Sequence, residues 1–269
     1  MGITRETLST TFNANGFASP LSILSYEEAL GYRLKLEAYE AARGQVDPKT
    51  QSRKTHLLLK WMFDLVNHKN ILDNVEDILG ENILCWGTSF FIKEPWDGTF
   101  VSWHQDITYW GLEPDDVLTA WLALSPVTKD SGCMRMLPGS HKKPRLEHHE
   151  TSDTANLLTR GQEISSSINE DKAFFIELQP GEISLHHGGT AHASAPNMTN
   201  DRRIGIAIRY ISPNVKSLAG DESAILLRGH DDYGHFHLEA APENNMDAAA
   251  IAEHERANTL RQAILTHLS

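Results

Sequence analysis

Residues 91–110, which read FIKEPWDGTFVSWHQDITYW, decide the interpretation of the whole chain. If the second half of this segment is extended, side chains two residues apart point to the same face. His104 and Asp106 would then present an imidazole and a carboxylate side by side, with Gln105 turned away. These groups are two of the three ligands in the 2-His-1-carboxylate triad that holds non-haem Fe(II). Because His-x-Asp pairs are common by chance, the prediction depends on a third ligand elsewhere in the chain.

A change of residue pattern at Ile83 separates a helical part of the chain from a β-rich part. Before it, helical periodicity and capping signals predict helices over residues 4–15, 26–43, 56–67 and 70–79. After it, β-type runs follow one another without intervening helices, at residues 83–93, around His104, and at 117–124, 133–137, 173–178, 183–186 and 203–211. Such an order is typical of a β-sandwich or barrel.

The tail of the chain, residues 246–268, is rich in Ala, Leu, Glu and Arg and predicts a closing helix. The length of 269 residues suits one large domain. We therefore expect a single domain over residues 1–269, with mainly helical support in 1–80, a β core in 81–213, and a C-terminal extension with a helix in 214–269.

Composition narrows the class of protein. The chain has 24 basic and 36 acidic residues, a net charge of −12, which argues against nucleic-acid binding because that relies on basic surface. No apolar run approaches the length of a membrane span, and the N-terminus lacks the apolar core of a secretory signal. We expect a cytoplasmic protein without a membrane or nucleic-acid partner, whose two cysteines, Cys85 and Cys133, are buried free thiols.

The third metal ligand must come from another part of the chain. The segment HHGGTAHAS, residues 186–194, lies between two predicted strands, where the returning chain could meet the first pair. Its histidines are His186, His187 and His192, and spacing alone does not choose between His187 and His192.

Two predicted strands show an alternation that is unusual for a solvent-facing surface. In residues 203–209, isoleucines take one face, while Arg203, Gly205, Ala207 and Arg209 take the other. That second face is small in the middle and cationic at both ends, as expected of a ligand-lined interior. In residues 117–125, parity likewise places Trp121 with Thr119 and Ala123, opposite three leucines.

Three separated motifs, WHQD (103–106), AWLALSPVTKDSGCMRMLPGSH (120–141) and HHGGTAHASAPN with DRR beyond (186–203), resemble the phytanoyl-CoA dioxygenase family of Fe(II)- and 2-oxoglutarate-dependent oxygenases. The likeness covers roughly residues 54–209, with the motifs in the family's order. It implies a mainly β fold with flanking helices and a double-stranded β-helix core, also called a jelly roll or cupin-like fold. It also implies Fe(II), 2-oxoglutarate and O2 as cofactor and co-substrates.

The resemblance assigns roles to particular residues. His192 becomes the third ligand beside His104 and Asp106, and Arg203 becomes the clamp for the distal carboxylate of 2-oxoglutarate, which suits its planar fork of donors. The remaining implied co-substrate contacts are the hydroxyl of Ser194, the ring of Trp121, Ser89, where the family usually has methionine, and Lys54.

The substrate is predicted less directly. Arg209 shares the inward parity of Arg203 and could bind an anionic group, with Arg135, Arg160 and Tyr109 as further candidates. Bacterial members of the family hydroxylate small polar molecules, which implies a small anionic or zwitterionic substrate such as 2-aminoethylphosphonate.

Two alternatives remain open at this stage. One is an acyl-CoA or secondary-metabolite hydroxylase of the same family, and the other is a non-catalytic jelly-roll binding protein. A homo-oligomer is compatible with either. Two further histidine groups have no assigned role. His148 and His149 lie in a polar loop that could form a lid. His235 and His237 lie in a segment whose His and Asp content resembles that of a metal site.

Overall fold

The computed structural model describes residues 5–44, 53–158 and 161–268. Its centre is formed by two facing β-sheets, which confirms the predicted jelly-roll core. The larger sheet has the strand order β1 (Phe17–Ser22), β10 (Glu182–His187), β5 (Val117–Ala123), β12 (Arg203–Ile211), β2 (Ile83–Lys93), β14 (Ser223–Arg228) and β15 (His237–Leu238). The smaller sheet has the order β3 (Val101–His104), β11 (His192–Ser194), β6 (Met134–Met136) and β9 (Phe174–Ile176).

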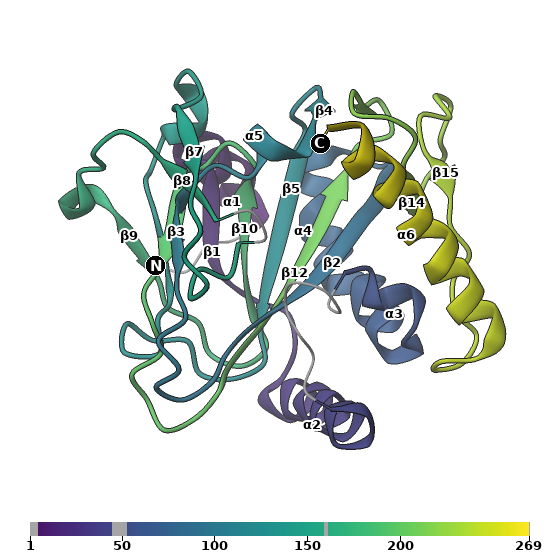
Figure 1. Ribbon diagram of the computed structural model, residues 1–269, viewed down its shortest axis with the longest axis horizontal. Helices are drawn as coiled ribbons and strands as arrows, with labels where there is room; N and C mark the ends of the chain where they lie inside the picture. The colour runs from purple at the N-terminus through teal and green to yellow at the C-terminus, as the bar shows by residue number, and fades with distance from the viewer. Residues whose placement is uncertain (1–4, 45–52, 159–160, 269) are drawn as a thin grey trace.

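The long strands β5, β12 and β2 form the middle of the molecule, with the short strands β3 and β9 on one side and helices α3 and α6 on the other (Figure 1). The helices are α1 (Arg5–Asn15), α2 (Tyr26–Arg43), α3 (Lys60–Val66), α4 (Lys69–Leu79), α5 (Ile107–Trp110) and α6 (Ala248–Leu268). Two small ribbons, β4 (Leu112–Glu113) with β13 (Lys216–Ser217) and β7 (His148–Glu150) with β8 (Gln162–Ile164), complete the strands. None of the described helices is long and apolar enough to cross a membrane.

The strand alternation read from the sequence decides which side chains face which layer. Ile204, Ile206 and Ile208 of β12 pack with α1, α3 and α4 in the main hydrophobic core. Trp121 and Ala207 belong instead to the apolar cluster between the two sheets. The face predicted to be ligand-lined therefore points into the space between the sheets.

The predicted helices are present with one difference. The capping box of α2 is confirmed, since Ser25 accepts from the backbone of Glu28 and the Glu28 carboxylate accepts from the backbone of Ser25. The helix predicted over 56–67 is divided into a short 3-10 turn, Thr55–Leu57, and α3, because Leu59 adopts an extended conformation. Cys85 and Cys133 are free and buried, as predicted.

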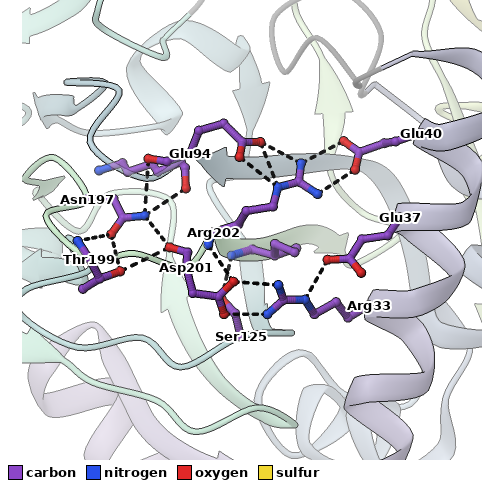
Figure 2. A network of polar contacts seen from close by, with 11 residues as sticks. Arg33, Glu37, Glu40, Glu94, Ser125, Asn197, Thr199, Asp201 and Arg202 are labelled. Carbon is purple, nitrogen blue, oxygen red and sulfur yellow. Dashed lines mark hydrogen bonds and ion pairs between the residues drawn. The ribbon is translucent and has the colours of Figure 1, made fainter.

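A network of ion pairs ties α2 to the loop between β11 and β12 (Figure 2). Arg202 binds Glu40 and Glu94 through paired contacts, and Arg33 binds Asp201 through another pair at 2.7 Å. Asn197 Nδ2 donates to the backbone oxygen of Asp201 at 2.8 Å. This loop joins Ser194 to Arg203, so the network fixes the relative position of two predicted co-substrate contacts.

Candidate active site

The two histidine ligands are direct neighbours across the smaller sheet. His104 is the last residue of β3 and His192 the first of β11, and the two are cross-strand partners. Their ring centroids lie 4.1 Å apart, and Asp106 Oδ1 lies 3.3 Å from His104 Nε2. One ligand atom from each of the three residues falls within 4.8 Å of the others. Among the described residues this is the single group of three or more with metal-ligand geometry.

Asp106 reaches the site in a way that differs from the prediction. The strand ends at His104, and Asp106 already has helical dihedral angles (φ −54°, ψ −47°) at the start of α5. Gln105 is turned away as expected, and its buried amide donates to Gly189 O at 2.7 Å and accepts from Leu146 N at 2.8 Å. The carboxylate therefore meets the imidazole through a turn held by Gln105, and not through alternation along one strand.

Hydrogen bonds fix which nitrogen of each imidazole faces the site. His104 Nδ1 donates to Ser102 O and His192 Nδ1 to Thr190 O, both at 2.9 Å. Because a carbonyl oxygen only accepts, each Nδ1 carries the proton and each Nε2 lone pair is free for a metal. Burial lowers the pKa of His192 to about 4, so this ring is neutral at neutral pH. Two neutral imidazoles and one carboxylate fit Fe(II).

The charge state of Asp106 also suits a metal ligand. Burial alone would raise the pKa of this carboxyl group, but the adjacent His104 ring, whose Nε2 lies 3.3 Å away, and the nearby His192 and Arg209 lower it below its usual range. The group is therefore a carboxylate, and a divalent cation between the three residues would be held by one formal negative charge.

A cavity extends from the triad between the two sheets. Its wall is formed by Phe91, Val101, His104, Asp106, Thr119, Trp121, Met134, His186, His192, Ala193, Ser194, Arg203, Ala207 and Arg209. Three of the predicted co-substrate contacts thus line the same cavity as the metal ligands. These contacts are Ser194, Trp121 and Arg203. A five-carbon keto diacid that chelates the metal would extend along this cavity.

Arg203 forms the far end of the cavity. Its guanidinium lies 5.2 Å from the centroid of the Trp121 ring and donates to Gly132 O at 2.8 Å and to Phe91 O at 3.4 Å. Its Nε has no partner among the described residues, and its side chain is 1% exposed. Burial lowers its pKa to about 10, so the group remains charged at neutral pH without an acidic partner in the described chain.

A second chamber opens on the other side of the triad. It is lined by Ser89, Phe90, Phe91, His104, Asp106, Tyr109, Trp110, Leu157, Leu158, Gln162 and Arg209. Arg209 lines both spaces, donates to Ser89 Oγ at 3.0 Å and lies 5.4 Å from the Trp110 ring centroid. Two of the predicted substrate contacts, Arg209 and Tyr109, therefore face this chamber. Ser89, predicted to touch the co-substrate, lies here as well.

Two predicted contacts lie away from both spaces. The Lys54 ammonium is buried and binds Ser223 and Glu239, so the structure does not bring it to the co-substrate. Lys54 has a positive φ of 51°, and its partner Glu239 is 185 residues away in the chain, so sequence spacing could not show this contact. Arg135 binds Glu170 and lies over Trp103, outside both cavity walls. Arg160 lies outside the described residues.

The remaining histidines have other partners. His187 packs near Phe12 and His141 on the outer face of β10, so the geometry favours His192 as the third ligand. His148 accepts a hydrogen bond from Gln105 N at 3.0 Å and donates one to Leu146 O, so both of its ring nitrogens have partners outside the triad.

Three further histidines lie at or near the surface. His149 is exposed, and His235 and His237 do not form a metal group in the described part of the chain.

Sequence reasoning gave no role to His186, which lines the cavity. Its ring centroid lies 5.0 Å from that of His192, and its Nδ1 has no partner among the described residues. Its cross-strand partner Thr119 also lines the cavity, and the Thr119 hydroxyl has no hydrogen-bond partner in the described part of the chain. The alternation of β10, with Ile183 and Leu185 on the outer face, carried the signal that residue 186 points inward.

Comparison with known proteins agrees with this geometry. The phytanoyl-CoA dioxygenase (PhyH) family model matches residues 16–205. A probable alpha-ketoglutarate-dependent hypophosphite dioxygenase from Stutzerimonas stutzeri is 30% identical over 167 residues, which are 61% of this chain and 58% of that protein. The peroxisomal phytanoyl-CoA dioxygenase of Homo sapiens is 29% identical over 161 residues, 57% of this chain and 46% of that protein. The chain thus spans about half the length of these curated relatives.

A solved structure gives a match over almost the whole chain. The apo form of the non-heme monooxygenase ThoJ is 36% identical with a TM-score of 0.85, covering 97% of this chain and 98% of that one. Its nickel complex is 33% identical with a TM-score of 0.81, covering 97% and 100%. A protein whose structure holds nickel therefore shares the overall architecture of this chain.

Proposed function

The chain belongs to the phytanoyl-CoA dioxygenase family, and from that premise we propose that it is an Fe(II)- and 2-oxoglutarate-dependent dioxygenase that hydroxylates a small anionic or zwitterionic molecule. The reaction replaces an unactivated C–H hydrogen by hydroxyl and converts 2-oxoglutarate and O2 to succinate and CO2. His104, Asp106 and His192 hold the metal, while Arg203 and Ser194 hold the distal carboxylate of 2-oxoglutarate. Aminoalkylphosphonates such as 2-aminoethylphosphonate are the first substrate class to test.

The metal and the protein would have different roles in the reaction. Bound Fe(II) supplies the oxygen activation, which no side chain can perform. The protein orients the metal ligands and the co-substrate. Hydrogen bonds from Nδ1 hold the two imidazoles in place, and Trp121 together with Arg203 sets the direction of the co-substrate. Phe90, Phe91 and Trp110 line the second chamber on the side of Asp106 where a substrate would enter.

Arg209 is the observation that supports an anionic substrate. Its guanidinium faces the second chamber, beside the metal ligands, and among the described residues no carboxylate forms an ion pair with it. Burial lowers the pKa of Arg209 although the nearby Asp106 carboxylate opposes the shift, so burying this cation carries a cost that Asp106 offsets only in part. An anionic substrate group would offset that cost and bring its neighbouring C–H bond close to Asp106 and the metal.

The comparisons support the same substrate class. The relative from Stutzerimonas stutzeri is named for hypophosphite, a small phosphorus oxyanion. A bulky acyl-CoA substrate remains the alternative within the family. A binding protein without turnover is the alternative of another class, and it would retain the cavity but release no succinate.

The test is succinate release under aerobic conditions with Fe(II), 2-oxoglutarate and a panel of phosphonates, phosphinates, amino acids and acyl-CoA esters. We expect stimulation by small anions. Arg209→Leu should raise the KM for such a substrate roughly 100-fold, since losing one partner of a buried charged contact costs about 3 kcal/mol. Arg135→Leu is the matched control, because that arginine binds Glu170 outside the site. Stimulation that is unchanged in Arg209→Leu would refute the proposed role, and no succinate with any compound would favour the binding protein.

A further inference from the structure

Lys93 is a second buried cation beside Arg203. It is the last residue of β2, and its cross-strand partner is Arg203, the first residue of β12. The lysine is 0% exposed and the arginine 1%. Buried lysines are rare unless they are paired, because taking an ammonium out of water is costly. A buried ammonium at Lys93 therefore requires interactions that offset the cost of its burial.

The contacts of Lys93 reach across to the smaller sheet. Its Nζ donates to Ser194 Oγ at 2.7 Å, to Ser194 O at 3.3 Å and to Ala195 O. These three acceptors match the three N–H donors of an ammonium. The lysine thus lies directly behind Ser194, whose side chain lines the cavity that holds the metal ligands.

This contact determines the direction of the Ser194 hydroxyl. When Lys93 donates to Ser194 Oγ, the hydroxyl hydrogen cannot point back toward the ammonium. The hydroxyl forms no other hydrogen bond among those of the described residues. It is therefore free to donate into the cavity, where an oxygen of a bound carboxylate would accept.

The electrostatics point to the same ligand. No described carboxylate forms an ion pair with Lys93 or with Arg203. Burial first, and then the charge of Arg203, lower the pKa of Lys93 to about 6, while Asp97 opposes this shift only in part. The ammonium form of Lys93 beside the charged Arg203 is therefore unfavourable in the empty cavity and becomes favourable when an anion enters.

Distances along the strands place the anion. The Arg203 guanidinium reaches back to the Trp121 ring, and Trp121 lies two residues along β5 from Thr119, which is level with Arg209 near the metal. Two residues of a strand span about 6.6 Å. A keto diacid that chelates the metal would therefore bring its far carboxylate to Arg203 and the Ser194 hydroxyl.

We propose that Lys93 is a positioning residue for the distal carboxylate of 2-oxoglutarate, acting through Ser194 by directing its hydroxyl into the cavity and adding positive charge behind it. This rests on the proposed function, which takes 2-oxoglutarate as the co-substrate. Lys93 itself lies behind the cavity wall and does not touch the ligand.

The test compares two chelating probes that differ at the far end. The affinities of 2-oxoglutarate and oxalate for the manganese-loaded protein are measured by calorimetry without O2. Oxalate chelates the metal but is too short to reach Arg203. In Lys93→Met we expect the Kd of 2-oxoglutarate to rise about tenfold to 100-fold, as for loss of a charged hydrogen bond, and the Kd of oxalate to stay within twofold.

Two further variants distinguish positioning from a general structural role. Lys93→Gln keeps amide donors but no charge, and it should give an intermediate Kd. Ser194→Ala should weaken 2-oxoglutarate binding in the wild-type background but have a smaller effect in Lys93→Met, since the two residues act in series. Lys60→Met, at a surface lysine on α3, is the matched control for loss of a lysine.

The outcomes separate the inference from its premise. Equal weakening of both probes in Lys93→Met, additive effects with Ser194→Ala, or an unchanged Kd of 2-oxoglutarate in a folded variant would each overturn the role of Lys93. If Lys93→Met does not fold, the same comparison in Lys93→Gln decides. A wild-type protein that binds oxalate but not 2-oxoglutarate would instead contradict the proposed function.

Discussion

A methyl group at Gly205 would strike the ring that orients the co-substrate. A Cβ built at this position lies 1.8 Å from Trp121 Cζ2 and 2.3 Å from Cη2. Carbon atoms in contact are about 3.5–4.0 Å apart, so the indole would have to move by roughly 2 Å in Gly205→Ala. Both residues face the cavity between two closely packed sheets, and over-packing of this kind costs about 1–3 kcal/mol. We expect the variant to lose that much stability.

The same displacement should weaken co-substrate binding. The ring of Trp121 lies against the Arg203 guanidinium at 5.2 Å, and a cation–π contact of this type contributes about 0.5–2 kcal/mol. A shifted indole loses that contact and narrows the cavity, so the Kd of 2-oxoglutarate should rise about tenfold or more. Calorimetric titration of 2-oxoglutarate into the manganese-loaded variant measures this change, and urea denaturation measures the loss of stability.

Two variants make the steric reasoning refutable. Gly31→Ala on α2 is the control, since a Cβ there meets nothing within 4 Å, and helix propensity predicts a gain of up to about 1 kcal/mol. Trp121→Leu removes the obstructing ring, so its combination with Gly205→Ala should be more stable than the two single changes predict. If Gly205→Ala unfolds at the wild-type urea concentration and binds 2-oxoglutarate with wild-type affinity, the packing argument is incorrect.

Three other predictions concern the metal, the supporting network and pH. His104→Ala should lose the metal after gel filtration and form no succinate; retained turnover would end the assignment of the triad. Arg202→Met removes the paired contacts with the buried Glu40 and should lower stability in urea by about 3 kcal/mol, whereas Arg5→Met, at an exposed surface pair, should lower it far less. Because the pKa of Lys93 is about 6 in the free protein and a carboxylate favours its charged form, 2-oxoglutarate binding should take up a proton above pH 6 and weaken as pH rises toward 8. Calorimetry in two buffers measures that uptake, and a flat pH profile in the wild type would contradict it.

Strand alternation carried most of what could be predicted about the site. In β12 the inward parity of Arg203 and Arg209 followed from isoleucines on the other face, and the structure places both arginines on cavity walls. In β5 the same reasoning placed Trp121 with small residues facing inward, as observed. The alternation read from the sequence is kept in the folded protein because the register of a strand is strongly specified. A shift of one residue would turn every side chain of the strand to the opposite face.

Contacts that depend on turns could not be predicted in the same way. Asp106 was expected on a strand but lies at the start of α5, and its approach to His104 depends on Gln105 bonding to a distant loop. Lys54 was expected at the co-substrate by resemblance, yet it has a positive φ and its ammonium binds Glu239. Both outcomes depend on one or two backbone angles and on partners more than 80 residues away, which local sequence patterns do not encode.

Specificity for an anion must arise inside this protein, because its exterior is unfavourable to one. The net charge of −12 repels anions at long range. The cavity walls reverse that sign, with Arg203 at one end, backed by Lys93 behind the wall, and Arg209 at the other end, near the metal ligands. A dianionic keto acid would neutralise the first end and the metal, but among the described residues Arg209 would still have no ion-pair partner. The second chamber therefore remains cationic after the co-substrate has bound, and a molecule that brings its own negative charge to Arg209 gains a contact that a neutral molecule of the same shape cannot make.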